Sequence, residues 1–443
     1  MLATEGMIEP LPSANVPIEI AAGTRDAMPA VTVVIPSWNG RDHLAECLVA
    51  IRRLDYPAEL VEVLVVDNGS TDDSAEWLVR EFPAVRLIQN QDNVGFAQAC
   101  NQGARKSDSP YVAFLNNDAR ADRLWLGALL GYLEANRDVA AAGSLVLDWD
   151  GTHIDFSGAG MTPFGRGIQL GYGTLRAAAP VQPVPLLFAN GAAMLVRRDV
   201  FLDAGGFDER FFAYYEDVDL GWRLWVLGWR VTLVPSSIVY HRHHGSSRRF
   251  APGQLDALMT RNAVMTAVKN YDDPTLERIL PILLLLETRR MRVAPPAIAA
   301  RYRPPGRDLV GIAQQERYAD HFGAAGAARA GVLALARRRL GGRLEAARIL
   351  LRPLAPRARV VGPVQVAQAV ALGDLLDIWP ELLEERSRIQ ARRKRPDSEI
   401  IPLFALATQQ RLPRSARLRS DETTEAAYRA LEGVGLDALL PRG

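Results

Sequence analysis

Short apolar runs alternate with segments of helical periodicity through the first part of the chain. The runs are rich in Val and Ile, which is typical of buried strands, and they fall at residues 31–35, 61–66, 85–88 and 111–115. The intervening segments place apolar residues at helical spacing over residues 41–54, 72–82 and 95–106. Strands that alternate with helices predict βαβ units and a mainly parallel sheet. We therefore expect an α/β fold of the Rossmann-like kind.

The pattern loosens and then changes further along the chain. Residues 148–185 are rich in Gly and Pro, which predicts either a long loop or irregular strands. Residues 214–228 predict a helix, and Pro235 is expected to separate two short strands at 230–234 and 238–240. Beyond Phe250 the composition shifts to Ala, Leu and Arg. Helical segments are expected there at 258–269, 275–291, 323–354 and 372–395, the last kinked or split at Pro380.

Three regions follow from these patterns. Residues 1–30 have no clear periodicity and are expected to form a flexible leader. Residues 31–250 contain the predicted strands and form the expected α/β domain. Residues 251–443 predict a mostly α-helical, Arg-rich C-terminal region.

Composition narrows the class of protein. The 443 residues are 48% hydrophobic and 23% charged, which is ordinary for globular domains and excludes a disordered or collagen-like chain. We expect no transmembrane helix, because no apolar run approaches the required length of about 20 residues. We also expect no signal peptide. Two cysteines, Cys47 and Cys100, are typical of a reducing cytoplasm.

The net charge of +1 conceals an acidic first half and a basic second half, which indicates regions with different partners. The basic stretch from Arg289 to Arg307 follows the apolar residues 279–286. Such a pair is compatible with peripheral contact with the inner face of the plasma membrane, but the favoured interpretation is a helical domain with a solvated, Arg-rich face. Arg392–Arg395 lacks an aromatic platform or a recognised module, so we expect no nucleic-acid partner.

Polar residues follow three of the predicted strands. Pro36, Ser37 and Asn39 end the first strand, Asp67 ends the second, and Asn116–Asp118 ends the fourth. Parallel strands present their carboxyl ends at one edge of a sheet, where α/β proteins bind ligands. Ordinary turn chemistry would use the same residue types, so the position along the strands is what favours a site.

Two further clusters lie later in the sequence. Glu216, Asp217 and Asp219 begin a predicted helix, where acidic residues complement the helix dipole. Neighbouring carboxylates shielded from water also raise one another's pKa, which suits a general base, whereas Asp219 is expected to be a structural cap. His241, His243 and His244 form the second cluster, and imidazole suits a divalent ion such as Mn²⁺.

Seven motifs in this order resemble those of family 2 glycosyltransferases. They are Val31–Asn39, Val65–Asp72, Asn93–Gly103, Phe114–Asp118, Gly205–Asp208, Tyr215–Leu220 and His241–Gly245. The triplet Asn116-Asn117-Asp118 is most similar to the rhamnosyltransferase-like branch. The resemblance covers about residues 31–250. It implies a GT-A fold, a nucleotide-diphosphate sugar as donor, a divalent metal and an inverting mechanism.

The resemblance also implies roles for particular residues. Asp67 would bind the donor's base, in a pocket lined by Pro36, Ser37 and Asn39 and extended by Asn116 and Asn117. Asp118 and His241 would hold Mn²⁺ or Mg²⁺. Asp217 would be the catalytic base, with Glu216 assisting it or contacting the acceptor.

One departure concerns the metal. The family usually has Asp-x-Asp where this chain has Asn116-Asn117-Asp118, so the site keeps one carboxylate and should depend less strictly on metal. The expected acceptor is a hydroxyl of a cell-surface polysaccharide or a lipid-linked glycan. We expect dTDP-rhamnose first and a UDP-sugar second as donor. The alternatives are an inactive sugar- or nucleotide-binding scaffold and a nucleotidyltransferase, although no basic Gly-rich loop follows the first strand.

Overall fold

The computed structural model describes residues 28–242, 254–290 and 363–404, together with residues 430, 431, 434 and 436. Most of the expected leader and the helix expected at 323–354 lie outside these described residues. So do His243, His244 and most of the basic stretch from Arg289 to Arg307.

A mixed sheet of ten strands forms the centre of the fold, in the order β10-β12-β6-β11-β4-β1-β2-β3, with β5 pairing β12 and β7 pairing β6. Its strands are β1 (Val31–Ser37), β2 (Val61–Asp67), β3 (Arg86–Gln89), β4 (Tyr111–Leu115), β5 (Ala119–Ala121), β6 (Val139–Asp148), β7 (Ile154–Phe156), β10 (Val184–Pro185), β11 (Ala193–Arg197) and β12 (Arg230–His241). A separate hairpin joins β8 (Gly158–Met161) to β9 (Gly167–Leu170).

The parallel part of the sheet is the part that the sequence predicts. β1 is buried along its whole length and lies between β2 and β4, parallel to both. A strand covered on both faces needs a continuous apolar run, which the Val- and Ile-rich sequence supplies. Ser37 pairs directly with Asp67 across β1 and β2, so the ends of these strands meet at one edge.

Helices cover the sheet and extend beyond it. Their bounds are α1 (Arg41–Ile51), α2 (Ser74–Glu81), α3 (Phe96–Lys106), α4 (Trp125–Ala135), α5 (Arg198–Asp203), α6 (Glu216–Val226), α7 (Gln254–Asn270), α8 (Asp273–Arg290), α11 (Pro363–Asp377), α12 (Trp379–Ala391) and α13 (Asp397–Ile400). Short 3₁₀ turns are η2 (Ala58–Leu60), η3 (Arg176–Ala178) and η4 (Glu209–Phe211). The predicted α/β class and the helical C-terminal region are both confirmed.

Several local predictions need correction. The two strands expected around Pro235 are one strand, β12, whose register shifts between Val234 and Ile238. The shift accommodates Pro235, which has no N–H to donate to a ladder. The Gly-rich segment 148–185 forms short strands, and α4 and β6 were not predicted. Helix α2 begins at Ser74, two residues later than the predicted start at residue 72.

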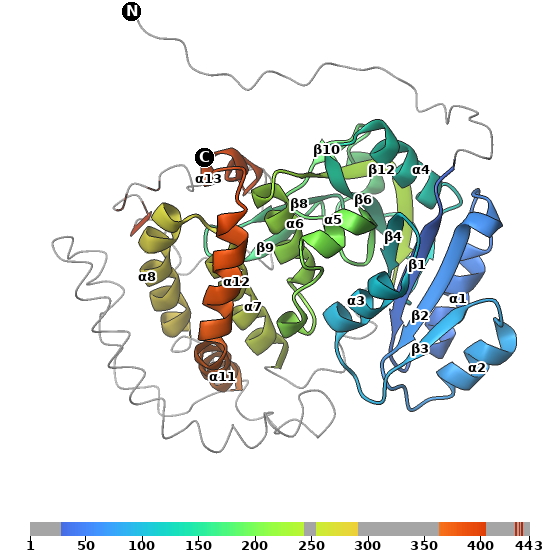
Figure 1. Ribbon diagram of the computed structural model, residues 1–443, viewed down its shortest axis with the longest axis horizontal. Helices are drawn as coiled ribbons and strands as arrows, with labels where there is room; N and C mark the ends of the chain where they lie inside the picture. Colours follow the sequence, from blue (N-terminus) through green and yellow to red (C-terminus); the bar gives the residue numbers. More distant parts are fainter. Residues whose placement is uncertain are drawn as a thin grey trace, which may run out of the picture.

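The C-terminal helices share the core of the α/β part. Figure 1 shows α7, α8, α11 and α12 grouped on the opposite side of the molecule from β3. Trp222 of α6 packs edge-on against Tyr271 and Phe404, with ring centroids 4.7 and 5.0 Å away. Trp222 and Trp225 are both buried and belong to the hydrophobic core. The predicted break at Pro380 is also confirmed, because α11 ends at Asp377 and Pro380 is the second residue of α12.

The basic run Arg392–Arg395, which follows α12, contacts α6 and the residues just after it. The guanidinium of Arg395 lies 4.8 Å from the ring of Trp225 and donates a hydrogen bond of 2.7 Å to the carbonyl of Trp229. Within the described ranges, no helix is long and apolar enough to cross a bilayer.

Close packing of α6 depends on one glycine. A methyl group at Gly221 would lie 2.4 Å from the Cα of Phe188 and 2.6 Å from the carbonyl oxygen of Leu187. We expect Gly221→Ala to lower the free energy of unfolding by about 1–3 kcal/mol, because the backbone of the facing segment must move. Urea denaturation followed by circular dichroism measures the change.

Gly131 provides the matched control. It also lies inside a helix, α4, but is exposed and has no atom within 4 Å of an added methyl group. Gly131→Ala should raise the free energy of unfolding by up to about 1 kcal/mol, since alanine favours the helix. Equal effects of the two substitutions would contradict the packing argument.

Candidate functional site

The polar residues that follow the parallel strands do meet at one edge. Asn117, just beyond β4, donates from Nδ2 to the hydroxyl of Ser37 over 3.1 Å. Ser37 in turn lies beside Asp67 in the ladder of β1 and β2. The structure thus brings together the residues that the sequence placed on this rim.

Asp67 is the member of the rim with a buried, unsatisfied oxygen atom. Its side chain is buried, and its Oδ2 accepts a hydrogen bond of 3.1 Å from the backbone N–H of Ser70. Its Oδ1 is buried without a hydrogen-bond partner among the described residues. Leaving a buried carboxylate oxygen unsatisfied costs stability. Such an oxygen is suited to accept a hydrogen bond from a bound ligand.

Asn39 and Pro36 contribute differently. The amide oxygen of Asn39 accepts from the N–H groups of Thr71 and Asp72, at 2.6 and 3.2 Å. Its backbone N–H donates to Ser70 over 2.8 Å, and its φ is +49°. Asn39 therefore holds the loop that follows Asp67. Pro36 is buried within β1 opposite Val66, which leaves its backbone as the part near the rim.

Asp118 and His241 meet because β5 pairs with the end of β12. Ala119 lies opposite His241 in that ladder, and the N–H of Arg242 donates to the carbonyl of Asp118 over 3.2 Å. This places Nε2 of His241 3.2 Å from Oδ1 of Asp118. The opposite ring nitrogen, Nδ1, lies 2.8 Å from Oδ2 of Asp155 on β7. The imidazole is thus held between two buried carboxylates.

These contacts set the electrostatics of the pair. Burial disfavours the charged imidazolium, but the hydrogen bonds with Asp118 and Asp155 outweigh burial and raise the pKa of His241 to about 10. Burial has the opposite effect on Asp118, yet the contact with His241 lowers the pKa of this carboxyl.

The spacing of Asp118 and His241 fits a small divalent cation. Two ligand atoms at about 2.1 Å, on neighbouring octahedral positions, lie roughly 3.0 Å apart. The observed 3.2 Å between Oδ1 and Nε2 is close to this value, so a cation would take the place of the proton that Nε2 shares with Asp118. Among the described residues, no group of three or more His, Cys, Asp or Glu side chains is arranged to hold a metal ion. A cation here would need further oxygens from a ligand.

Asn116 lies next to this pair. Its Nδ2 is 3.5 Å from Nε2 of His241, and its backbone N–H donates to the carbonyl of Ala192 over 3.0 Å. The amide therefore occupies the neighbourhood of the candidate metal ligands without adding a negative charge.

Glu216 and Asp217 open helix α6, as the sequence predicted, beside the segment that precedes β11. Oδ2 of Asp217 accepts a hydrogen bond of 2.9 Å from the N–H of Gly191, and Oδ1 accepts one of 2.8 Å from the N–H of Val218. Glu216 is buried, and its Oε2 meets no hydrogen-bond partner in the part of the chain that is described.

Burial raises the pKa of both carboxyls, but not with equal effect. The pKa of Glu216 is raised well above its usual value by burial and by the charge of Asp217. For Asp217, burial also raises the pKa, while the N–H groups of Gly191 and Val218 oppose that rise. Burial therefore favours the protonated form of both carboxyls, and the charge of Asp217 adds to this effect at Glu216.

Two members of this neighbourhood were missed in the sequence. Gly191 follows Asn190 within an otherwise apolar stretch, and Asp155 lies in the Gly- and Pro-rich segment, so neither stands in a pattern that indicates a site. Asp219 was expected to be a cap; instead it is buried and paired with Arg223 at 2.7 Å and Lys269 at 2.8 Å. The spacing of Asp219 and Arg223, four residues apart on a helix, was the signal available for that pairing.

In open α/β sheets, ligands bind outside the carboxyl ends of the strands, which is where the polar residues of this rim lie. Comparison with known proteins agrees. The family model for glycosyl transferase family 2 matches residues 32–203. N-acetylglucosaminyl-diphospho-decaprenol L-rhamnosyltransferase of Mycobacterium tuberculosis is 31% identical over 247 residues, which are 50% of this chain and 78% of that protein. The chain therefore belongs to glycosyltransferase family 2 and is a glycosyltransferase.

Other similar proteins are more distant or longer. Pre-mycofactocin glycosyltransferase of the same species is 30% identical over 220 residues. The match covers 49% of this chain and 44% of that protein. Among solved structures, GalNAc-T7 with UDP, GalNAc and Mn²⁺ has a TM-score of 0.46 at 16% identity, and the match covers 61% of this chain and 52% of that one. PcManGT from Pyrobaculum calidifontis, solved with GDP-Man and Mn²⁺, has a TM-score of 0.42 at 17% identity, over 80% and 88% of the two chains.

Proposed function

We propose that this glycosyltransferase moves a sugar from a nucleotide diphosphate to a hydroxyl of a lipid-linked or cell-surface glycan, with inversion at the anomeric carbon. The observation that supports this most is the link between Asp217 and the strand-end rim. Gly191 donates to Asp217 while its neighbour Ala192 accepts from Asn116, so base and rim share one short segment. A base fixed next to a donor site is what direct transfer requires.

The donor proposal rests on Asp67. The ring N–H of thymine or uracil would donate a hydrogen bond to Oδ1 of Asp67, which has no partner among the described residues. Ser37 and Asn117 would line the same pocket, with Pro36 through its backbone and Asn39 through the loop that it holds. dTDP-rhamnose is the first donor to test, because a 31% identical relative is named as an L-rhamnosyltransferase. A UDP-sugar is the second.

In the proposed reaction, Asp217 accepts the proton of the acceptor hydroxyl as its oxygen attacks the anomeric carbon. The bond from that carbon to the diphosphate oxygen breaks, and the nucleoside diphosphate leaves with the bonding electrons. Glu216, as a neutral carboxylic acid, would donate a hydrogen bond to the acceptor. The difference in pKa between neighbours gives each carboxyl its own role.

Asp118 and His241 would hold Mn²⁺ or Mg²⁺ against the diphosphate. Such a cation would supply positive charge to the leaving group. Asp155 would orient the imidazole of His241 through its contact with Nδ1, an arrangement that is common for metal-binding histidines.

Donor class is tested first, by calorimetric titration with dTDP-rhamnose, UDP-N-acetylglucosamine and GDP-mannose, each with Mn²⁺ and with a chelator. We expect metal-dependent binding of the dTDP- or UDP-sugar. Failure of all three to bind folded protein would contradict the proposed donor site.

Asp217→Asn tests the base. The amide cannot accept the proton, so we expect kcat to fall by about 10²–10⁴-fold, while the Kd for the donor stays within about two-fold. Release of nucleoside diphosphate in the presence of a prenyl-diphosphate-linked N-acetylglucosamine acceptor measures turnover. Asp73→Asn, at an exposed carboxylate paired with Arg41, is the control and should keep full activity. Unchanged turnover in Asp217→Asn would rule out the assignment.

The raised pKa of Asp217 predicts a pH profile. The base works when ionised, so kcat/KM should fall as the pH drops through a pKa above the usual carboxyl value of about 3.9. Glu216→Gln replaces a neutral acid by a neutral amide and should leave this acidic limb close to its original position. A limb that disappears in Glu216→Gln would mean that Glu216 is the titrating base.

Asp155→Asn tests the metal site without relying on activity. Loss of the carboxylate leaves His241 less firmly oriented, so the Kd for Mn²⁺ in the presence of nucleoside diphosphate should rise about 10- to 100-fold. Calorimetry measures it directly. Asp148→Asn is the control, because Asp148 pairs with the exposed His153 at 3.2 Å instead. Equal affinities in wild type and Asp155→Asn would refute the orienting role.

A further inference from the structure

The segment that leads into the Glu216–Asp217 pair has a strained backbone. Phe212, Tyr214 and Tyr215 have φ values of +64°, +66° and +73°, in the left-handed region that residues other than glycine rarely adopt. Each such residue costs on the order of 1–3 kcal/mol and persists only where the surroundings enforce it. Contacts outside this segment must therefore hold it.

Helix α7 supplies most of those contacts, and the N–H of Ala97 on α3 adds one hydrogen bond of 3.2 Å to the carbonyl of Phe212. Asn262 is fully buried, and its Nδ2 lies within hydrogen-bond distance of three carbonyl oxygens, those of Phe211 at 3.1 Å, Ala213 at 3.1 Å and Tyr214 at 2.7 Å. The side-chain amide of Asn262 thus contacts backbone carbonyls both before and after the strained residue Phe212. Arg261 adds a hydrogen bond of 2.7 Å to the carbonyl of Arg210.

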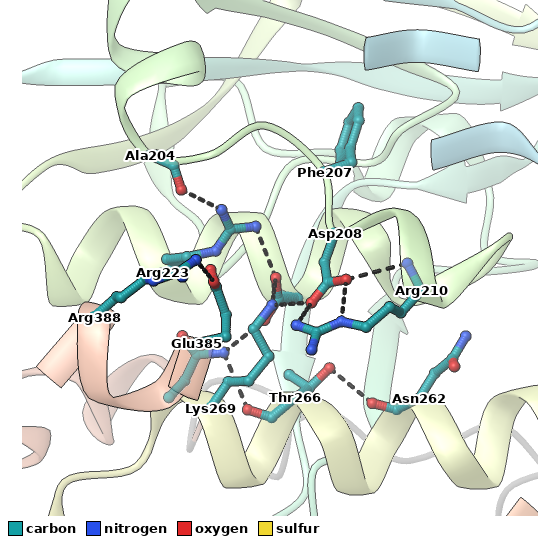
Figure 2. A network of polar contacts seen from close by, with 12 residues as sticks. Ala204, Phe207, Asp208, Arg210, Arg223, Asn262, Thr266, Lys269, Glu385 and Arg388 are labelled. Carbon is teal, nitrogen blue, oxygen red and sulfur yellow. Dashed lines mark hydrogen bonds and ion pairs between the residues drawn. The ribbon is translucent and has the colours of Figure 1, made fainter. Parts of the chain in front are cut away.

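The same helix also fixes the ends of the segment. Lys269 is buried, and its Nζ lies 2.7 Å from Oδ2 of Asp208 and 2.8 Å from Oδ2 of Asp219. Asp208 lies before the strained residues and Asp219 lies after Asp217. Figure 2 shows Lys269 and Asn262 projecting from one helix, with Lys269 reaching toward Asp208. Asn270 donates to the other oxygen of Asp219 over 2.9 Å.

The ionic contacts hold Asp219 and Asp208 in place but do not touch the backbone that aims Asp217. Replacing either partner of a buried ion pair leaves a charge unpaired and destabilises the whole fold, so Lys269 is a poor residue for a functional test. Asn262 is uncharged. Besides donating to the three carbonyls of the turn, its side chain accepts one hydrogen bond, of 3.1 Å, from Nε of Arg261 on the same helix. Asn262 is the residue through which the positioning of Asp217 can be tested.

We propose that Asn262 is a positioning residue for the catalytic base, holding the turn at 211–215 in the conformation that presents Asp217 to the acceptor. This inference rests on the proposed role of Asp217. It makes α7, which lies outside the residues matched by the family model, part of the machinery of transfer. Asn262 itself touches neither donor nor acceptor.

Asn262→Leu removes the donors at similar side-chain volume. We expect kcat to fall roughly 10- to 100-fold, because a displacement of about 1 Å at a reacting group can cost this much. The KM and the calorimetric Kd for the donor should stay within two-fold of wild type. Asn262→Ser retains one shorter donor and should give an intermediate kcat. If Asn262→Leu does not fold, the kcat and donor Kd of Asn262→Ser are compared with those of wild type instead.

Arg386→Met is the matched control. Arg386 of α12 is buried and donates to the carbonyls of Val268 and Tyr271, near the end of α7, without reaching the turn at 211–215. It also pairs with Asp273, whose side chain is exposed, so its replacement leaves no buried charge without a partner there. The substitution Arg386→Met should lower the melting temperature and leave kcat unchanged at temperatures well below it. An equal loss of kcat in Arg386→Met would attribute the effect to general destabilisation and overturn the proposal.

The remaining outcomes separate the inference from the function on which it rests. If Asp217→Asn is inactive while Asn262→Leu keeps the wild-type kcat, the inference is wrong and the base assignment stands. A raised KM with unchanged kcat in Asn262→Leu also overturns it. If Asp217→Asn is fully active, the proposed function itself fails.

Discussion

Parallel pairing of β1 with β2 and β4 is the constraint from which the site follows. Parallel strands share a direction, so whatever follows each of them must emerge at the same edge. The register then fixes neighbours, as when Ser37 lies opposite Asp67. Burial of both faces by apolar side chains leaves that edge as the place where polar groups of this sheet gather. The proposed donor site is therefore a consequence of strand order.

The parallel strands and the helices between them were predictable, because apolar periodicity reports which face of an element is buried. The same reasoning singled out Asp67, Asp118 and Asp217 as candidates, since each stands at the end or start of a regular element. It missed the contact of Asp155 with His241, because that contact depends on β7 and β12 both joining β6. No pattern within a short window encodes such an encounter.

Asp219 illustrates a different failure. As an acidic residue in the first turn of a helix, it resembles an ordinary complement to the helix dipole. Its real surroundings are buried, and Lys269, fifty residues further along the chain, neutralises it together with Arg223. The charge of a residue is evident from sequence, but whether water or another side chain compensates it is decided by the tertiary fold.

The position of Asn262 and Lys269 on α7 has a geometric consequence. They are seven residues apart, nearly two helical turns, so they lie on one face about 10 Å apart along the axis. A single residue inserted between them would rotate one away from the other by about 100°. Lys269 would leave its carboxylates, or Asn262 would leave its turn. This stretch of α7 can therefore vary in the residues of its other faces, but its length between these two positions is fixed.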